Sequence, residues 1–108
     1  RGAGEQIREA VVAWPGITAH PHRFGGTEFI YGERREIGHT HGDQMVDIPF
    51  STRIRAELVA AGRAEAHHIL PETGWVSFYL REAGDVERAI ELFRMSYELA
   101  VKQKQTAE

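Results

Sequence analysis

Turn-forming residues divide the segment 17–50 into short β-prone runs, and this pattern constrains the fold more than any other feature. The turn signals are Gly25–Gly26, Gly32–Glu33 and Gly42–Asp43. The runs between them are rich in aromatic and β-branched side chains, which is typical of antiparallel strands joined by tight turns. The predicted strands span 17–20, 27–31, 34–41 and 44–50. Pro49 limits the last of these to a sheet edge or a strand end.

Apolar residues repeat with helical spacing in three other segments. The first predicted helix spans 4–13 and ends before Pro15–Gly16, because proline disfavours a helical conformation in the residue before it. The second spans 52–61, with Ser51 as N-cap and Gly62 just beyond its end. The third begins at Asp85, which we expect to cap it, and we expect residues 102–108 to fray. A last apolar strand is predicted at 75–80.

The predicted order is helix, three or four strands, helix, strand, helix. Strands that are grouped together, instead of alternating with helices, favour the α+β class, with a small antiparallel sheet and helices packed on one face. A chain of 108 residues fits a single domain, so we assign residues 1–108 to one unit. The other face of the sheet would then be available for a ligand or a partner.

Composition narrows the function classes. With 13 Lys and Arg against 16 Asp and Glu, the net charge of −3 argues against nucleic acid as a partner. Cysteine is absent, which excludes disulfides, thiolate catalysis and zinc–sulfur sites. No apolar run reaches the ~18 residues of a membrane span, and no signal peptide is recognisable. We expect a cytoplasmic protein that does not use a membrane. The oligomeric state stays open.

Six histidines are many for so short a chain, and they occur as three close pairs: His20 and His22, His39 and His41, His67 and His68. Protonation of all six would move the formal charge from −3 to +3. Because the ordinary pKa of histidine is about 6.5, we expect any function here to respond to pH between about 5 and 8.

The segment Arg35–His41 contains the sharpest of these pairs. Alternation along a strand places His39 and His41 on one face, roughly 6.5–7 Å apart, together with Arg35 and Ile37. Glu36 would point to the opposite face unless a β-bulge intervenes. Two imidazoles so placed would share a metal ion or act as acid and base, or they would form a hydrated pair on the strand surface.

The other histidine pairs leave alternatives open. If residues 67–68 are extended, either His67 or His68 must face inward, where a third imidazole would complete a three-histidine metal site. The alternative is a linker pair in which one ring bonds a backbone carbonyl. His20 and His22 flank a proline, and we assign them structural or surface roles.

Two further residues are candidates for the site. Asp47 lies on the strand face opposite Val46 and Ile48, where it would either orient an imidazole across the sheet or be solvated. Trp75 would either belong to the core or form the wall of a pocket for an aromatic ligand.

Several motifs resemble those of bacterial luciferase-family proteins, which share a domain with fungal luciferase. The motifs are Trp14-Pro15-Gly16, His22-Arg23-Phe24-Gly25-Gly26, Arg35-Glu36-Ile37-Gly38-His39-Thr40-His41-Gly42-Asp43, Asp47-Ile48-Pro49-Phe50 and Gly74-Trp75-Val76-Ser77. The resemblance covers about residues 11–100. The order of elements, with Ser96-Tyr97 in the last helix, is also similar to the small YjbR-like α+β proteins.

The resemblance implies a small aromatic or enolic substrate, such as a pyrone, and O2 as co-substrate without a flavin. It makes His39, His41 and His67 candidates for base, proton shuttle or metal ligands. Arg35 would stabilise an oxyanion, and Glu36 would pair with Arg35 or orient a histidine. We place Phe24, Asp47 and Trp75 among the residues that bind the substrate.

We therefore expect an enzyme that performs oxygen-dependent or acid–base chemistry on such a molecule. It would use either no cofactor or a divalent metal. The alternatives are a module that binds a small molecule or a protein without catalysis, and a protein whose histidines hold Zn²⁺, Fe²⁺ or Cu²⁺.

Overall fold

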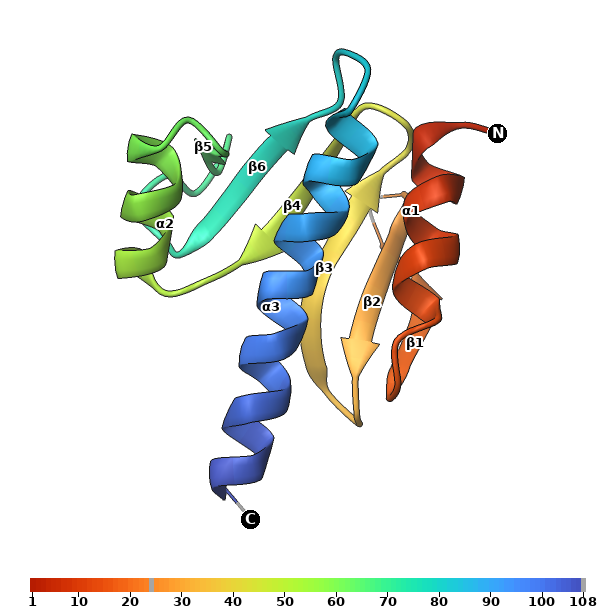
Figure 1. Cartoon of the computed structure of the whole chain (residues 1–108), viewed down its shortest axis with the longest axis vertical. Helices are drawn as coiled ribbons and strands as arrows, with labels where there is room; N and C mark the ends of the chain where they lie inside the picture. Colours follow the sequence, from red (N-terminus) through yellow and green to blue (C-terminus); the bar gives the residue numbers. More distant parts are fainter. Residues whose placement is uncertain (24, 108) are drawn as a thin grey trace.

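A computed structural model describes residues 1–23 and 25–107. Its centre is one six-stranded antiparallel sheet with the strand order β1-β2-β3-β4-β6-β5 (Figure 1). The strands are β1 (Ile17–Pro21), β2 (Thr27–Tyr31), β3 (Arg35–His41), β4 (Met45–Pro49), β5 (Glu65–Ala66) and β6 (Trp75–Tyr79). The first four strands are neighbours in both sequence and space, as the predicted turns require.

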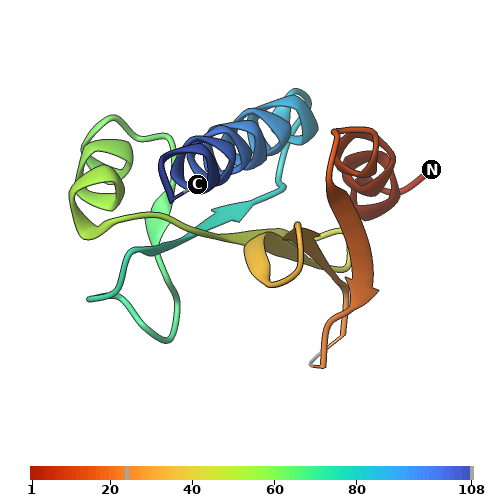
Figure 2. The same ribbon diagram turned by 90° about the horizontal axis from the view of Figure 1, so that it is seen from below.

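Three helices pack on one face of this sheet, and Figure 2 shows all of them on the same side. They are α1 (Ala3–Val12), α2 (Thr52–Ala60) and α3 (Asp85–Ala107). The α+β class and the order of its main elements are therefore confirmed. The β5–β6 connection projects from the opposite face (Figure 2), which we call the open face. Within the described residues, no helix is both long and apolar enough to span a membrane.

The structure corrects three local predictions. The two-residue strand β5 was not expected, because two residues carry no alternation to recognise. Helix α3 does not fray at 102 but continues to Ala107, and its last turns contact the sheet through Arg35–Gln103 and Lys104–Tyr31. Asp85 was expected to cap the first turn of α3. Its carboxylate instead accepts backbone N–H bonds from Arg81 and Glu82, which precede the helix.

The core lies between the sheet and the helices. Side chains that alternate along the strands enter it, and Phe29 of β2 meets Phe93 of α3 edge-to-face at 5.4 Å between ring centroids. Burying such a ring stabilises the fold by roughly 1.5–3 kcal/mol. Ile7 and Val11 of α1 complete the same core. The core also contains Ile17, Ile37, Val46, Ile48, Leu58, Ala64, Val76, Ala89, Leu92, Tyr97 and Ala100.

A β-bulge in β3 decides which residues reach the open face. Phe29 of β2 pairs with Gly38, but Ile30 pairs with Glu36, so Ile37 is an extra residue in β3. Gly38 has φ +141°, and a Cβ there would lie 2.6 Å from the Phe93 ring. Glycine therefore permits both the kink and the close approach of α3.

The bulge overturns the predicted side-chain faces of Arg35 and Ile37. Both were expected beside His39, yet Ile37 is buried in the core and Arg35 bonds Gln103 of α3 on the helix side. Glu36, which a regular strand would have turned toward the helices, contacts His39 instead. A single inserted residue reverses the strand alternation on its N-terminal side.

Candidate histidine–carboxylate site

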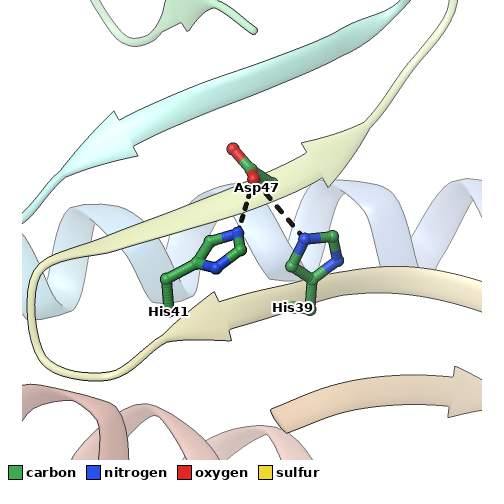
Figure 3. Close-up of side chains that lie close together, drawn as sticks. All are labelled: His39, His41 and Asp47. Atoms are coloured by element: carbon green, nitrogen blue, oxygen red, sulfur yellow. Dashed lines mark hydrogen bonds and ion pairs between the residues drawn. The ribbon is translucent and has the colours of Figure 1, made fainter. Parts of the chain in front are cut away.

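The β3–β4 hairpin brings His39, His41 and Asp47 together. Its register pairs His39 with Asp47 across the two strands, so their side chains share the open face. In Figure 3 both imidazoles point toward the carboxylate. The Asp47 Oδ2 atom lies 2.8 Å from His41 Nε2 and 3.4 Å from His39 Nε2.

Asp47 is 1% exposed, and both of its oxygens have partners. Ser77, which lies opposite Asp47 on β6, donates its hydroxyl to Oδ1 at 2.6 Å. Oδ2 faces the imidazoles. Burial alone would raise the pKa of Asp47, but hydrogen bonds from His39, Ser77 and His41 outweigh that effect and hold the pKa far below its usual range.

The β5–β6 connection adds two more imidazoles to the same oxygen. His67 Nε2 lies 3.3 Å and His68 Nε2 lies 3.4 Å from Asp47 Oδ2, and the two rings stack at 4.4 Å. Only one of the pair was expected to turn inward. Four imidazole nitrogens therefore surround a single carboxylate oxygen.

The tautomer of His67 follows from its backbone partners. Its Nδ1 accepts hydrogen bonds from the backbone N–H groups of Ile69 and Leu70, at 3.1 and 3.0 Å. A neutral ring that accepts at Nδ1 carries its proton on Nε2, the atom that faces Asp47. Burial lowers the pKa of His67, which keeps this neutral form at pH 7. His67 is thus a donor to Asp47.

His39 is held from both sides. Glu36 Oε2 lies 2.6 Å from its Nδ1, and Asp47 lies near its Nε2. Burial lowers the pKa of His39, but the hydrogen bonds to Asp47 and Glu36 more than offset this and raise the pKa to about 9. His22 stacks on His39 at 4.0 Å, and burial followed by the nearby His39 lowers the pKa of His22.

A pocket of about 540 Å³ opens over the cluster. Trp75 forms one wall, with its ring 5.4 Å from the His39 ring. Ile69 and Leu70 form an apolar rim and are 70% and 50% exposed, which is unusual for such large side chains. The lining comprises His22, Glu36, His39, His41, Asp47, His67, His68, Ile69, Leu70 and Trp75.

The structure brings most of the predicted site residues together but not all of them. Arg35 lies in a neighbouring pocket that shares Glu36 and Trp75 with this one. His20 is exposed and bonds Thr18 at 2.9 Å, in keeping with a surface role. Phe24 lies outside the described residues.

The sequence analysis assigned His22 a structural or surface role, kept His68 only as an alternative to His67, and did not include Ser77 in the site. The two histidines lie on connections between strands, where periodicity carries no information about direction. Ser77 could have been found, because it alternates with Val76 and Phe78 on a strand and so faces the same side as Trp75.

Comparison with known families identifies the chain. The model of the luciferase domain matches residues 34–96, more than half of the sequence. The chain belongs to the luciferase-domain family. The matched part of this luciferase-domain protein contains all four imidazoles around Asp47, together with Glu36, whereas His22 precedes it. No curated protein and no solved structure gives a significant match.

Proposed function

We propose that this luciferase-domain protein is an oxidoreductase that oxidises a small aromatic or enolic molecule with O2, without a flavin, at the histidine–carboxylate cluster. The observation that supports this most is the convergence of the imidazoles on buried Asp47 beneath a pocket walled by Trp75. Burying charged groups costs free energy that hydrogen bonds and charge pairing only partly offset, and titratable groups with strongly shifted pKa values in a pocket are candidates for a functional site. We assign the reaction to the cytoplasm, a reducing compartment that is compatible with a sequence without cysteine.

The pocket suits a planar substrate. Its volume of about 540 Å³ lies within the roughly 300–1,000 Å³ typical of small-molecule sites. The indole of Trp75 offers a face for stacking, and Ile69 and Leu70 would cover the opposite apolar edge. Among the lining residues Asp47 and His39 are buried whereas Ile69 and Leu70 are exposed, so the acidic hydroxyl of an enol or phenol would point inward toward the imidazoles.

His41 is the best placed base in this reaction. Its Nε2 bonds Asp47 at 2.8 Å, which favours the tautomer with the proton on Nε2 and the lone pair on Nδ1. His41 is also more exposed than His39, so a substrate in the pocket can reach its ring. Asp47 would stabilise the imidazolium that forms when His41 takes the enol proton.

The proposed chemistry balances without a further reactant. Loss of the enol proton to His41 leaves an enolate whose carbon is electron-rich. That carbon forms a bond to one oxygen atom of O2, which is reduced by two electrons to the peroxide level. The distal oxygen then takes the proton back from His41. The product is a ketone that bears a hydroperoxide on the adjacent carbon.

An oxygen electrode tests the proposal. Flavin-free protein should consume O2 when supplied with hydroxypyrones or enolisable phenols. His41→Gln should lower kcat by about 10²–10⁴, the range expected for loss of a general base. His20→Gln, a change at an exposed histidine outside the pocket, is the matched control and should leave kcat unchanged. Equal loss in both variants, or binding of these compounds without O2 consumption, would contradict an oxidase.

A further inference from the structure

We propose that the cluster binds one divalent ion of a first-row transition metal through His39 Nε2, His41 Nε2 and Asp47 Oδ2. Each of these three residues offers one donor atom, a ring nitrogen or a carboxylate oxygen, within 4.8 Å of those of the other two. The binding stands on geometry alone. Only its catalytic consequence, that the ion acts on the enolic substrate, rests on the function proposed above.

The number of donors around one oxygen favours a bound ion. A carboxylate oxygen accepts about two hydrogen bonds. Asp47 Oδ2 instead has four imidazole nitrogens at 2.8, 3.3, 3.4 and 3.4 Å. All four cannot donate to it well, and lone pairs turned toward the carboxylate would be repelled. With a cation bound beside the oxygen, these nitrogen lone pairs would coordinate the cation, and the repulsion would be replaced by a favourable interaction.

The spacing of the donor atoms also fits an ion. Metal–nitrogen and metal–oxygen bonds of about 2.0–2.2 Å place neighbouring ligand atoms about 3.0 Å apart in an octahedron and about 3.4 Å apart in a tetrahedron. The two separations between Asp47 Oδ2 and the hairpin imidazoles, 2.8 and 3.4 Å, span this range. Small side-chain shifts would suffice to admit the ion.

The orientation of the His39 ring and of the Asp47 carboxylate is fixed by neighbouring side chains. Glu36 Oε2 contacts Nδ1 of His39 at 2.6 Å, and this contact directs the Nε2 atom of the ring toward Asp47. A carboxylate that holds the far nitrogen of an imidazole is the usual support of a metal-binding histidine, because it fixes the ring and its tautomer. Ser77 fixes the carboxylate of Asp47 in the same way.

The tautomer of His67 indicates that this residue does not coordinate the ion. Both backbone N–H bonds to its Nδ1 would have to break before Nε2 could present a lone pair. His67 therefore donates to Asp47 beside the ion. His68 is more exposed and faces Asp47 Oδ2 at 3.4 Å, so it is the residue placed to add a fourth ligand.

The donor set indicates the kind of ion. Two imidazoles and one carboxylate suit Fe²⁺ or Zn²⁺, whereas Mg²⁺ and Ca²⁺ prefer oxygen ligands alone. Two histidines and one carboxylate with open positions are also the set that non-haem iron oxygenases use. With the ion bound, His41 would serve as a ligand instead of a base, and the enol oxygen of the substrate would occupy an open position.

Calorimetric titration of metal-stripped protein with Zn²⁺ tests the site, with Mg²⁺ as the control ion. We expect one Zn²⁺ per chain and no measurable binding of Mg²⁺. Asp47→Asn and His41→Gln should each weaken Zn²⁺ binding at least 100-fold, with circular dichroism to establish that they fold. His20→Ala and His67→Gln should retain one Zn²⁺ per chain. Wild-type protein that binds no Zn²⁺, or Asp47→Asn that binds it equally well, would overturn the proposal.

Oxygen consumption distinguishes failure of this inference from failure of the proposed function. Metal-stripped and Fe²⁺-loaded protein are compared with the same enol. Turnover that is equal in both overturns the catalytic role of the ion and leaves His41 as the base. Binding of Zn²⁺ without turnover under either condition supports the metal site and contradicts the oxidase function alone.

Discussion

The two faces of the sheet are both buried where β3 meets β4, yet they are built from opposite chemistry. On the helix side Ile37, Val46 and Ile48 are fully buried among apolar neighbours. On the open face His39 is 7% and Asp47 1% exposed. The helices of the described residues lie on the other side of the sheet (Figure 2). The open face is covered instead by polar side chains and by the β5–β6 connection.

This contrast separates stability from function. The apolar face stabilises the fold in proportion to the area that it buries. A buried carboxylate surrounded by imidazoles stabilises the fold less than its close contacts suggest, because desolvation offsets much of the attraction between the charges. A polar face of this kind is therefore best understood as a site. Substitutions on the helix side should mainly lower the stability of the fold. Substitutions on the open face should mainly reduce ligand binding and turnover.

The largest loss of stability is expected on the helix side. Phe93→Ala removes the ring that packs against Phe29 and Gly38, which should lower the free energy of unfolding by about 3–5 kcal/mol. Guanidinium denaturation measures the change. A loss below about 1 kcal/mol would show that α3 is not seated on the sheet as described.

Gly38→Ala tests the bulge that links the two faces. The added Cβ would lie 2.6 Å from the Phe93 ring and 2.9 Å from the backbone oxygen of Asp47, at a φ of +141°. We expect a loss of about 3 kcal/mol, from backbone strain and overpacking together. The variant should also lose affinity for Zn²⁺, because the bulge sets the direction of Glu36 and His39. Unchanged stability and affinity would contradict the bulge.

The pH dependence of stability reports on the open face in the metal-free protein. The pKa of His39 is raised to about 9 by Glu36 and Asp47, with His22, His41 and Trp75 also around its ring. The contribution of protonated His39 to the free energy of unfolding is complete below about pH 6.5 and is lost as the pH rises through about 9. Urea denaturation should show a decline of up to about 3 kcal/mol between pH 6.5 and 10.

His39→Gln is the control for that decline, because the variant should show little of it. For Asp47 the sign is reversed: its lowered pKa stabilises the fold above about pH 4, and the benefit is lost as the pH falls below that. Identical profiles for His39→Gln and the wild type between pH 6.5 and 10 would remove His39 as the source.

The smallest effect is expected far from either face of the β3–β4 hairpin. Ser51 caps α2 by accepting the backbone N–H of Ile54 at 3.1 Å. Ser51→Ala should cost about 1 kcal/mol, the usual value of an N-cap, and leave Zn²⁺ binding unchanged. Thermal denaturation and calorimetry measure the two quantities. A change in Zn²⁺ affinity would show that α2 is coupled to the site.

Local patterns were enough to predict most of the fold but only part of the site. Alternation and helical spacing located the main elements, and they placed Asp47 opposite Val46 and Ile48. They could not reveal the bulge at Ile37–Gly38, because it depends on a contact with a helix more than fifty residues away. The positions of His22 and His68 could not be predicted for a related reason. Both residues lie on connections between strands, and the course of a connection is set by tertiary contacts.

The central claim is that the imidazoles converge on Asp47, and long-range ¹⁵N–¹H NMR of the histidine rings in metal-free protein tests it most directly. At pH 7 we predict that His39 carries protons on both nitrogens and that His67 is neutral with its proton on Nε2. Rings of His39 and His67 that titrate together near the ordinary histidine pKa of about 6.5 would contradict this convergence.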